Sequence, residues 1–144
     1  MKIHIGTDHA GFELKNKLVE YLNELGHDIT DHGAFSYDPT DDYPDFIKPC
    51  AEAVAKDTES LGIILGGSGQ GEAMCANHVQ GIRAGVYVGG DIEIVKLLRE
   101  HNDANILSVG ARFVAEDEAE KAVQVFLETP FSNDPRHARR LAKF

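Results

Sequence analysis

The sequence predicts an α/β fold built on a parallel β-sheet. Short apolar runs typical of buried strands alternate with longer amphipathic stretches typical of helices, and this alternation occurs five times along 144 residues. Strands that are separated by helices pair in parallel, so helices are expected to cover both faces of the sheet. The length suits one domain with a substantial core, and no internal repeat or linker divides the chain.

The first half of the chain predicts two strands and two helices. KIHIG (2–6) is the first strand, and HDITDHG (27–33) is a second, shorter one. After a polar loop, residues 45–57 predict the second helix. The first helix is predicted over 10–25, with apolar side chains at helical spacing: Phe12, Leu14, Leu18, Tyr21, Leu22 and Leu25.

The second half continues the alternation. LGIILG (61–66) is apolar enough for a buried strand, and residues 71–79 predict a short helix. The remaining elements are predicted strands over 82–88 and 105–110 and predicted helices over 91–102 and 115–129. Right-handed connections between parallel strands then predict a Rossmann-like three-layer α/β/α sandwich with a five-stranded parallel sheet.

Composition excludes several classes of function. The formal net charge of −10 argues against a nucleic-acid or anionic-membrane partner, because both need a basic surface. No apolar stretch is long enough to cross a bilayer, and the N-terminus shows no secretory signal. The two cysteines, Cys50 and Cys75, do not make a disulfide framework and are expected to be reduced thiols in a cytoplasmic protein.

The loop after the third strand, LGGSGQGE (65–72), lies where parallel sheets bind ligands, at the carboxyl end of a strand. It fails the G-x-G-x-x-G dinucleotide pattern and lacks the lysine of a P-loop, so no nucleotide cofactor is predicted. One interpretation is a tight turn whose glycines satisfy unusual backbone angles. The favoured one is a run of exposed backbone N–H groups at a helix N-terminus, suited to an oxyanion or a phosphate.

Glu72 stands in the first turn of the helix that follows this loop. Taken alone, such a carboxylate often only complements the helix dipole. Beside an anion hole, and without a metal cluster or cofactor motif, it indicates proton abstraction next to a carbonyl group. Burial would raise its pKa and make it a competent base. Ser68 either exchanges protons with substrate oxygens or caps the helix.

Asp8 and His9 follow the first strand, at the same predicted edge of the sheet. They are either an N-cap beside a solvent-facing histidine, or ligands for a sugar hydroxyl and a phosphate. His101 and Asn102 end the fourth helix, which places them at the opposite edge. They are therefore either a helix C-terminus with a favourable histidine, or site residues that a second subunit supplies in an isologous dimer.

The C-terminal stretch concentrates positive charge in an acidic chain. DPRHARR (134–140) is either a solvated tail or a phosphate clamp, in which Arg136 and Arg140 share a helical face. No metal site is predicted, because the histidines show no ligand spacing and the YDPTDDYPD loop lacks the glycine and distal glutamate of an EF-hand. Tyr43, in that loop, is expected to turn toward the site.

Five segments, taken together and in order, resemble the ribose-5-phosphate isomerase B family, whose relatives include the galactose-6-phosphate isomerase subunits. They are GTDHAGFELK, DYPDF, GGSGQGEAMCANHVQGIRAG, REHNDANILSVGAR and RHARR. The resemblance covers essentially the whole chain. It implies one isomerase domain over 1–144, with 131–144 as a basic tail that contributes to phosphate binding. It also implies aldose–ketose isomerisation of a phosphosugar through a cis-enediol, without metal or cofactor, in dimers or dimers of dimers.

The resemblance also implies a role for each candidate residue. One branch of the family carries a cysteine base where this chain has Gly66, so the chain resembles the glutamate branch, with Glu72 as base and no such role for Cys75. Asp8 would contact the sugar, Ser68 would orient or shuttle protons, and His101 would assist ring opening. The enediolate would be held by amides and an amide side chain: Gly67, Gly69, Gly71 and Asn102. The phosphate would be bound by His9, Arg112, Arg136 and Arg140, with Tyr43 and His137 as further contacts.

Two alternatives stay open at this point. The same isomerisation is compatible with another phosphosugar: a tetrose phosphate, allose or galactose 6-phosphate, or a deoxy-sugar phosphate. A phosphosugar-binding protein without catalysis is the other alternative, although binding alone needs no base.

Overall fold

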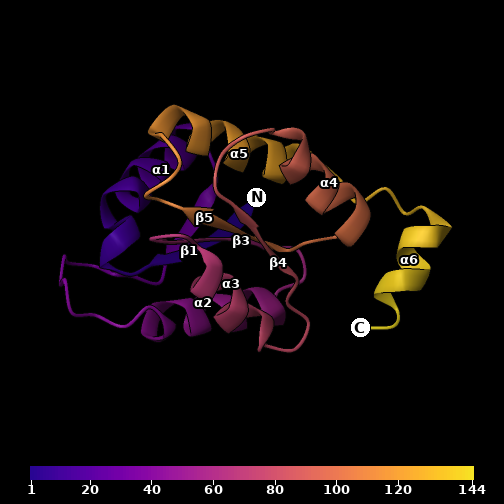
Figure 1. Ribbon diagram of the computed structural model, residues 1–144, viewed down its shortest axis with the longest axis horizontal. Helices are drawn as coiled ribbons and strands as arrows, with labels where there is room; N and C mark the ends of the chain where they lie inside the picture. The colour runs from indigo at the N-terminus through magenta and orange to yellow at the C-terminus, as the bar shows by residue number, and fades with distance from the viewer.

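The computed structural model describes residues 1–144 and contains one five-stranded sheet (Figure 1). The strand order is β2-β1-β3-β5-β4, and every neighbouring pair is parallel. The strands are β1 (Lys2–Thr7), β2 (Asp28–Asp31), β3 (Leu61–Gly66), β4 (Ala84–Tyr87) and β5 (Ile106–Gly110). The prediction of a five-stranded parallel sheet is confirmed.

Helices cover both faces of this sheet. Figure 1 shows α1, α4 and α5 on one face and α2 and α3 on the other, which confirms the three-layer sandwich. The helices are α1 (Phe12–Glu24), α2 (Pro44–Lys56), α3 (Gln70–Asn77), α4 (Glu93–Asn102), α5 (Glu116–Glu128) and α6 (Pro135–Leu141). None of them combines the length and the apolar character that crossing a membrane demands.

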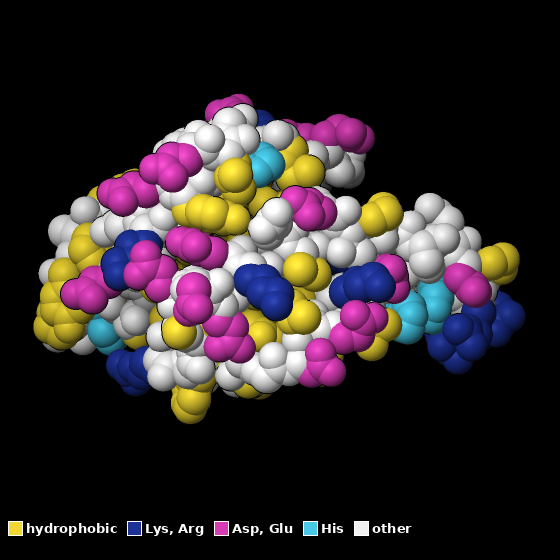
Figure 2. Space-filling view, turned by 90° about the horizontal axis from the view of Figure 1, so that it is seen from above, with side chains coloured by type: hydrophobic (Ala, Val, Ile, Leu, Met, Phe, Trp, Pro, Cys, Tyr) yellow, Lys and Arg dark blue, Asp and Glu magenta, His cyan; other side chains and the backbone are white.

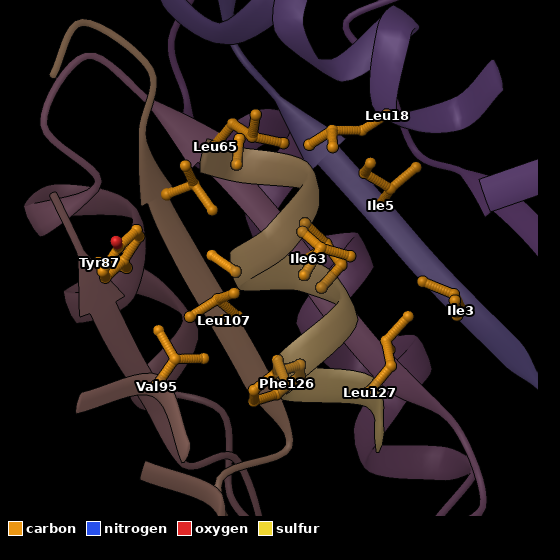
Figure 3. Packing of buried hydrophobic residues seen from close by; sticks show 14 of the residues in the cluster. Ile3, Ile5, Leu18, Ile63, Leu65, Tyr87, Val95, Leu107, Phe126 and Leu127 are labelled. Atoms are coloured by element: carbon orange, nitrogen blue, oxygen red, sulfur yellow. The ribbon is translucent and has the colours of Figure 1, made fainter. Parts of the chain in front are cut away.

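Two hydrophobic clusters, one on each face, hold the layers together. The larger contains 17 buried residues and packs α1 and α5 against the sheet. In Figure 3, Phe126 and Leu127 of α5 lie against Ile63 of β3 and Leu107 of β5. The smaller cluster of 8 residues packs α2 and α3 against the other face. Because β3 and β5 contribute to both clusters, they are buried on both faces, as their continuous apolar runs predict.

The first helix differs from its prediction at both ends. It begins with a 3₁₀ turn at His9–Gly11, because the Asp8 carboxylate accepts a hydrogen bond from the Ala10 amide. Leu25, predicted on the buried face, lies just past the helix and is 50% exposed. The helix instead buries Lys15, whose Nζ donates to Asp31 Oδ2 at 2.6 Å and to the Ala34 carbonyl at 2.9 Å.

Other predicted boundaries moved by a few residues. The strand predicted over 27–33 ends at Asp31, whose side chain accepts a hydrogen bond from the Gly33 amide and so turns the chain. The strand predicted over 82–88 is reduced to Ala84–Tyr87. In the C-terminal stretch, where Arg136 and Arg140 were expected to share a helical face, the structure forms α6, with Asp134 as its N-cap.

Candidate active site

The order in which strands are added to the sheet reverses between β1 and β3. From β1 it adds β2 on one side, and then returns to place β3 on the other side of β1. Parallel sheets bind ligands at such a switch point, beside the carboxyl ends of the two strands. Thr7 pairs with Leu65 in register, and its Oγ1 donates to the Leu65 carbonyl at 3.0 Å. The residues after β1 and the glycine loop after β3 therefore lie side by side.

The glycine loop folds closely onto the end of β5. Gly69 adopts a positive φ of 74°, which favours glycine, and its carbonyl accepts a hydrogen bond from Ser108 Oγ at 2.7 Å. The turn interpretation therefore holds at Gly69. Ser68 Oγ lies 3.4 Å from the Gln70 amide, a long contact for a helix cap, and its own O–H donates to no protein acceptor. The Ser68 hydroxyl thus remains available to a ligand.

Glu72 is buried at the start of α3, with only 5% of its surface exposed. Its carboxylate lies directly against Gly66, where an added Cβ would be 1.9 Å from Oε1. Burial raises the pKa of Glu72, and the nearby charge of Asp8 raises it further, while a hydrogen bond from its own backbone amide opposes them. A carboxylate in the first turn of a helix also complements the helix dipole. This one has the desolvation that makes glutamate a stronger base.

Asp8 lies close enough to this carboxylate for its charge to act on the pKa of Glu72, and His9 follows Asp8 in the chain. Asp8 is buried, and one of its oxygens caps the 3₁₀ turn through the Ala10 amide at 2.9 Å, as the N-cap interpretation predicted. His9 Nδ1 lies 2.6 Å from Asp41 Oδ1 and 3.8 Å from Asp8 Oδ2. The hydrogen bond to Asp41 is the main cause that raises the pKa of His9.

Asp41 is a site residue that the sequence analysis missed. It belongs to the YDPTDDYPD loop, whose sequence indicates only that it is not an EF-hand. Asp8, His9 and Asp41 each place one potential metal ligand within 4.8 Å of the others. His9 Nδ1 and Asp41 Oδ1 already share a hydrogen bond, and the absence of a metal from the site stays a prediction. The signal in the sequence was the concentration of four aspartates in this loop, from Asp38 to Asp45, which suggests that one of them has a partner elsewhere in the fold.

Tyr43 and Arg112 approach the glycine loop from two other elements. Tyr43 precedes α2, and its hydroxyl would be 2.8 Å from a Cβ at Gly71. Arg112 follows β5, and its guanidinium would be 3.3 Å from a Cβ at Gly67. One chain therefore brings together six of the predicted side chains and the glycine loop: Asp8, His9, Tyr43, Ser68, Glu72 and Arg112, with Gly67, Gly69 and Gly71 between them.

Five predicted residues lie elsewhere: His101, Asn102, Arg136, His137 and Arg140. Helix α4 starts after the carboxyl end of β4 and ends before the amino end of β5, so His101 and Asn102 lie at the edge opposite the glycine loop. The rings of His101 and His137 stack with centroids 4.1 Å apart, which attaches α6 to α4. Helix α6 protrudes at one end of the molecule, where basic and histidine side chains gather (Figures 1 and 2). Within one chain, His101 and Asn102 thus lie at the sheet edge opposite the glycine loop, as predicted from the topology.

The two cysteines lie apart from this chemistry. Both are free, and Cys50 is buried in the smaller cluster. Cys75 lies one helical turn after Glu72, and burial raises the pKa of its thiol. A raised pKa keeps the thiol protonated at neutral pH, which is a poor state for a nucleophile.

Comparison with known proteins identifies the family of this chain. A family model described as Ribose/Galactose Isomerase matches residues 3–144. Ribose-5-phosphate isomerase B of Mycolicibacterium paratuberculosis is 45% identical over 141 residues, covering 98% of this chain and 87% of that protein. The Mycobacterium tuberculosis protein of the same name is 43% identical, with 98% and 86% covered.

Solved structures of proteins with the same name also resemble this chain. The crystal structure of ribose-5-phosphate isomerase B from Mycoplasma genitalium with bound ribulose-5-phosphate superposes with a TM-score of 0.93 at 38% identity, covering 99% of this chain and 92% of that one. The Clostridium thermocellum ribose-5-phosphate isomerase B superposes with a TM-score of 0.92 at 42% identity, covering 99% and 94%. With a family model over nearly its whole length and relatives this similar, the chain belongs to the ribose/galactose isomerase family that includes ribose-5-phosphate isomerase B.

Proposed function

We propose that the protein interconverts ribose 5-phosphate and ribulose 5-phosphate, with Glu72 as the base that moves a proton between C1 and C2. The observation that carries this proposal is the buried Glu72 carboxylate, held against Gly66 beside a loop of glycines at the switch point of the sheet. A relative of the same architecture has been solved with ribulose-5-phosphate bound. The reaction is redox-neutral within the sugar, so it needs no cofactor.

The proposed steps balance as two proton transfers. Glu72 removes the proton from C2 of the open-chain aldose, and the bonding pair forms a C1–C2 double bond while the carbonyl oxygen on C1 becomes an oxyanion. The loop amides around Gly67, Gly69 and Gly71 face this charge. A second proton moves from the C2 hydroxyl to the C1 oxygen, for which Ser68 is placed as a shuttle. Glu72 then returns its proton to C1, which leaves a ketone at C2.

Substrate selection is the first test of this function. The purified protein is expected to convert ribose 5-phosphate with a higher kcat/KM than four-carbon or six-carbon phosphosugars, measured by ketose formation across the series. A higher kcat/KM for a tetrose, hexose or deoxy-sugar phosphate would show that this phosphosugar is the preferred substrate of the same isomerisation. Saturable binding of ribose 5-phosphate without any ketose would instead indicate a binding protein.

The residues at the opposite edge enter this mechanism only through a second copy of the chain. We propose a homodimer in which the partner supplies His101 for ring opening, Asn102 for the enediolate, and Arg136, His137 and Arg140 for the phosphate. Strand β4 is an edge strand with no pairing on its outer side. Beside it, a hollow of about 470 Å³ is lined by residues that include Asn102 and Phe144. Three exposed apolar side chains belong to this region: Val88 follows β4, Ile94 lies in α4, and Phe144 lines the hollow.

Mixing two inactive variants tests this sharing. Glu72→Gln and His101→Asn chains, unfolded together and refolded, are expected to recover about one quarter of wild-type activity. Half of the random dimers are mixed, and each mixed dimer has one site with both residues intact. A site contained within one chain predicts no recovery, since every site would then lack Glu72 or His101. Each variant refolded alone is the control, and association of two dimers into a tetramer leaves the expected fraction unchanged.

A further inference from the structure

The contact between His9 and Asp41 joins two segments that are far apart in the sequence. Asp41 Oδ1 accepts from the His9 backbone amide at 3.1 Å and lies 2.6 Å from Nδ1 of the same residue. Two hydrogen bonds to one oxygen fix both the backbone and the ring of His9. The ring's other nitrogen, Nε2, has no hydrogen-bond partner in the protein. Asp41 therefore determines which face of the imidazole is left for a ligand.

The Asp41 carboxylate is itself largely removed from solvent. Its side chain is 9% exposed, and its second oxygen, Oδ2, is buried without a hydrogen-bond partner. A buried carboxylate is costly unless a positive charge compensates it. The cation within reach is a protonated His9, at the short distance typical of a charge-assisted hydrogen bond.

The negatively charged groups around His9 also favour its protonated form. Asp8, on its own segment, lies 3.8 Å from Nδ1, and Asp38 in the facing loop adds a third negative charge. Tyr37 of that loop meets the ring edge-on at 6.3 Å between centroids. Arg112 is the one facing cation and opposes protonation. The hydrogen bond to Asp41 is the largest cause that raises the pKa of His9, the charges of Asp8 and Asp41 raise it further, and burial and Arg112 oppose them.

We propose that Asp41 is a positioning residue, which holds His9 as an imidazolium with Nε2 directed at the substrate phosphate. The proposal deepens the function proposed above and rests on it for the role of His9. Asp41 itself would not touch the substrate. Its contribution is to supply a second fixed cation beside Arg112, in a site whose remaining positive charges come from the partner subunit.

This arrangement has a signature in the pH dependence of substrate binding. The imidazolium binds a phosphate dianion better than neutral imidazole does, so KM is expected to rise as pH increases through the raised pKa of His9. Removing the Asp41 charge lowers that pKa toward the ordinary value, so the rise in KM moves to lower pH. The proton transfer at C1 and C2 is remote from His9, and kcat is expected to change little.

The test compares Asp41→Asn with Asp38→Asn as a matched control. Both substitutions remove one negative charge near His9, but only Asp41 bonds to the ring, while Asp38 bonds to Thr40. Asp41→Asn is expected to raise KM for ribose 5-phosphate about tenfold at neutral pH, with kcat within about twofold. Asp38→Asn is expected to keep the wild-type pH profile of KM. Equal effects of the two variants, or a loss confined to kcat, would overturn the proposal.

A direct titration of His9 separates this inference from the proposed function. The imidazole is followed by NMR in the free protein and with inorganic phosphate, and its signals are assigned by their loss in His9→Gln. Wild-type His9 is expected to titrate at higher pH than His9 in Asp41→Asn, whichever sugar the protein converts. Unchanged titration would overturn the proposal even with full isomerase activity. A His9 that titrates only after EDTA treatment would assign the cluster to a bound cation, and would overturn it as well.

Discussion

Replacing Glu72 with glutamine is expected to lower kcat for ribose 5-phosphate by about 10²–10⁴-fold, with KM nearly unchanged. Glutamine has the shape of glutamate and keeps the contact with Gly66, but its amide cannot accept the C2 proton. Steady-state rates and calorimetric titration with ribose 5-phosphate measure the two effects separately. Glu93→Gln is the matched control, because Glu93 also lies in the first turn of a helix but is exposed.

The same substitution has an opposite expected effect on stability. The pKa of Glu72 is raised in the folded protein, so ionising it on folding costs free energy at every pH above its unfolded pKa. Glutamine removes that charge, and the Tm of Glu72→Gln is expected to exceed the wild-type Tm at neutral pH, with the difference vanishing in acid. A variant that loses activity and Tm together would indicate a structural role for Glu72 and contradict the base assignment.

Substituting Gly66 with alanine is expected to lower kcat by about 10²-fold, although residue 66 carries no reactive group. The new methyl would lie 1.9 Å from Glu72 Oε1 and 2.0 Å from Cδ, so the carboxylate has to leave its position. Overpacking of this kind also destabilises a protein by about 1–3 kcal/mol. Rates with ribose 5-phosphate and denaturant unfolding measure the two consequences.

A double variant shows whether that clash is the cause. Gly66→Ala combined with Glu72→Ala removes the side chain that the methyl meets, so most of the lost stability is expected to return while activity stays absent. If the single Gly66→Ala variant kept wild-type kcat, Glu72 would have to act from another position, and the geometry proposed here would be wrong. If the double variant stayed as unstable as the single one, the destabilisation would lie in the backbone of β3.

The sheet and its helices were predictable because their signals are local. The apolar run of β3 and the alternation of strand and helix are properties of short windows, and they predicted a parallel sheet without any knowledge of contacts. Topology alone also placed His101 at the edge opposite Glu72. Two of the boundary errors have a common cause, because Asp8 and Asp31 end or begin elements through side-chain hydrogen bonds that periodicity does not register.

The contacts that complete the site could not be predicted in this way, because they join distant segments. Asp41 reaches His9 across 32 residues of sequence, and nothing in a run of loop aspartates identifies which one turns inward. Lys15 shows the same dependence on distant partners: a lysine on a helix usually stays in solvent, but this one is buried because it donates to the Asp31 carboxylate at the end of β2 and to the Ala34 carbonyl in the loop that follows. In each case the polar partner decides the burial.

The occupied space at Gly66 constrains how this family could have diversified. The family resemblance implies two branches, one with a carboxylate base at 72, as in this chain, and one with a thiol base at 66. A side chain at 66 would enter the volume that the Glu72 carboxylate fills, so the two bases exclude each other sterically. A lineage that exchanged one for the other had to change both positions together, or pass through an ancestor whose Glu72 was already displaced or lost.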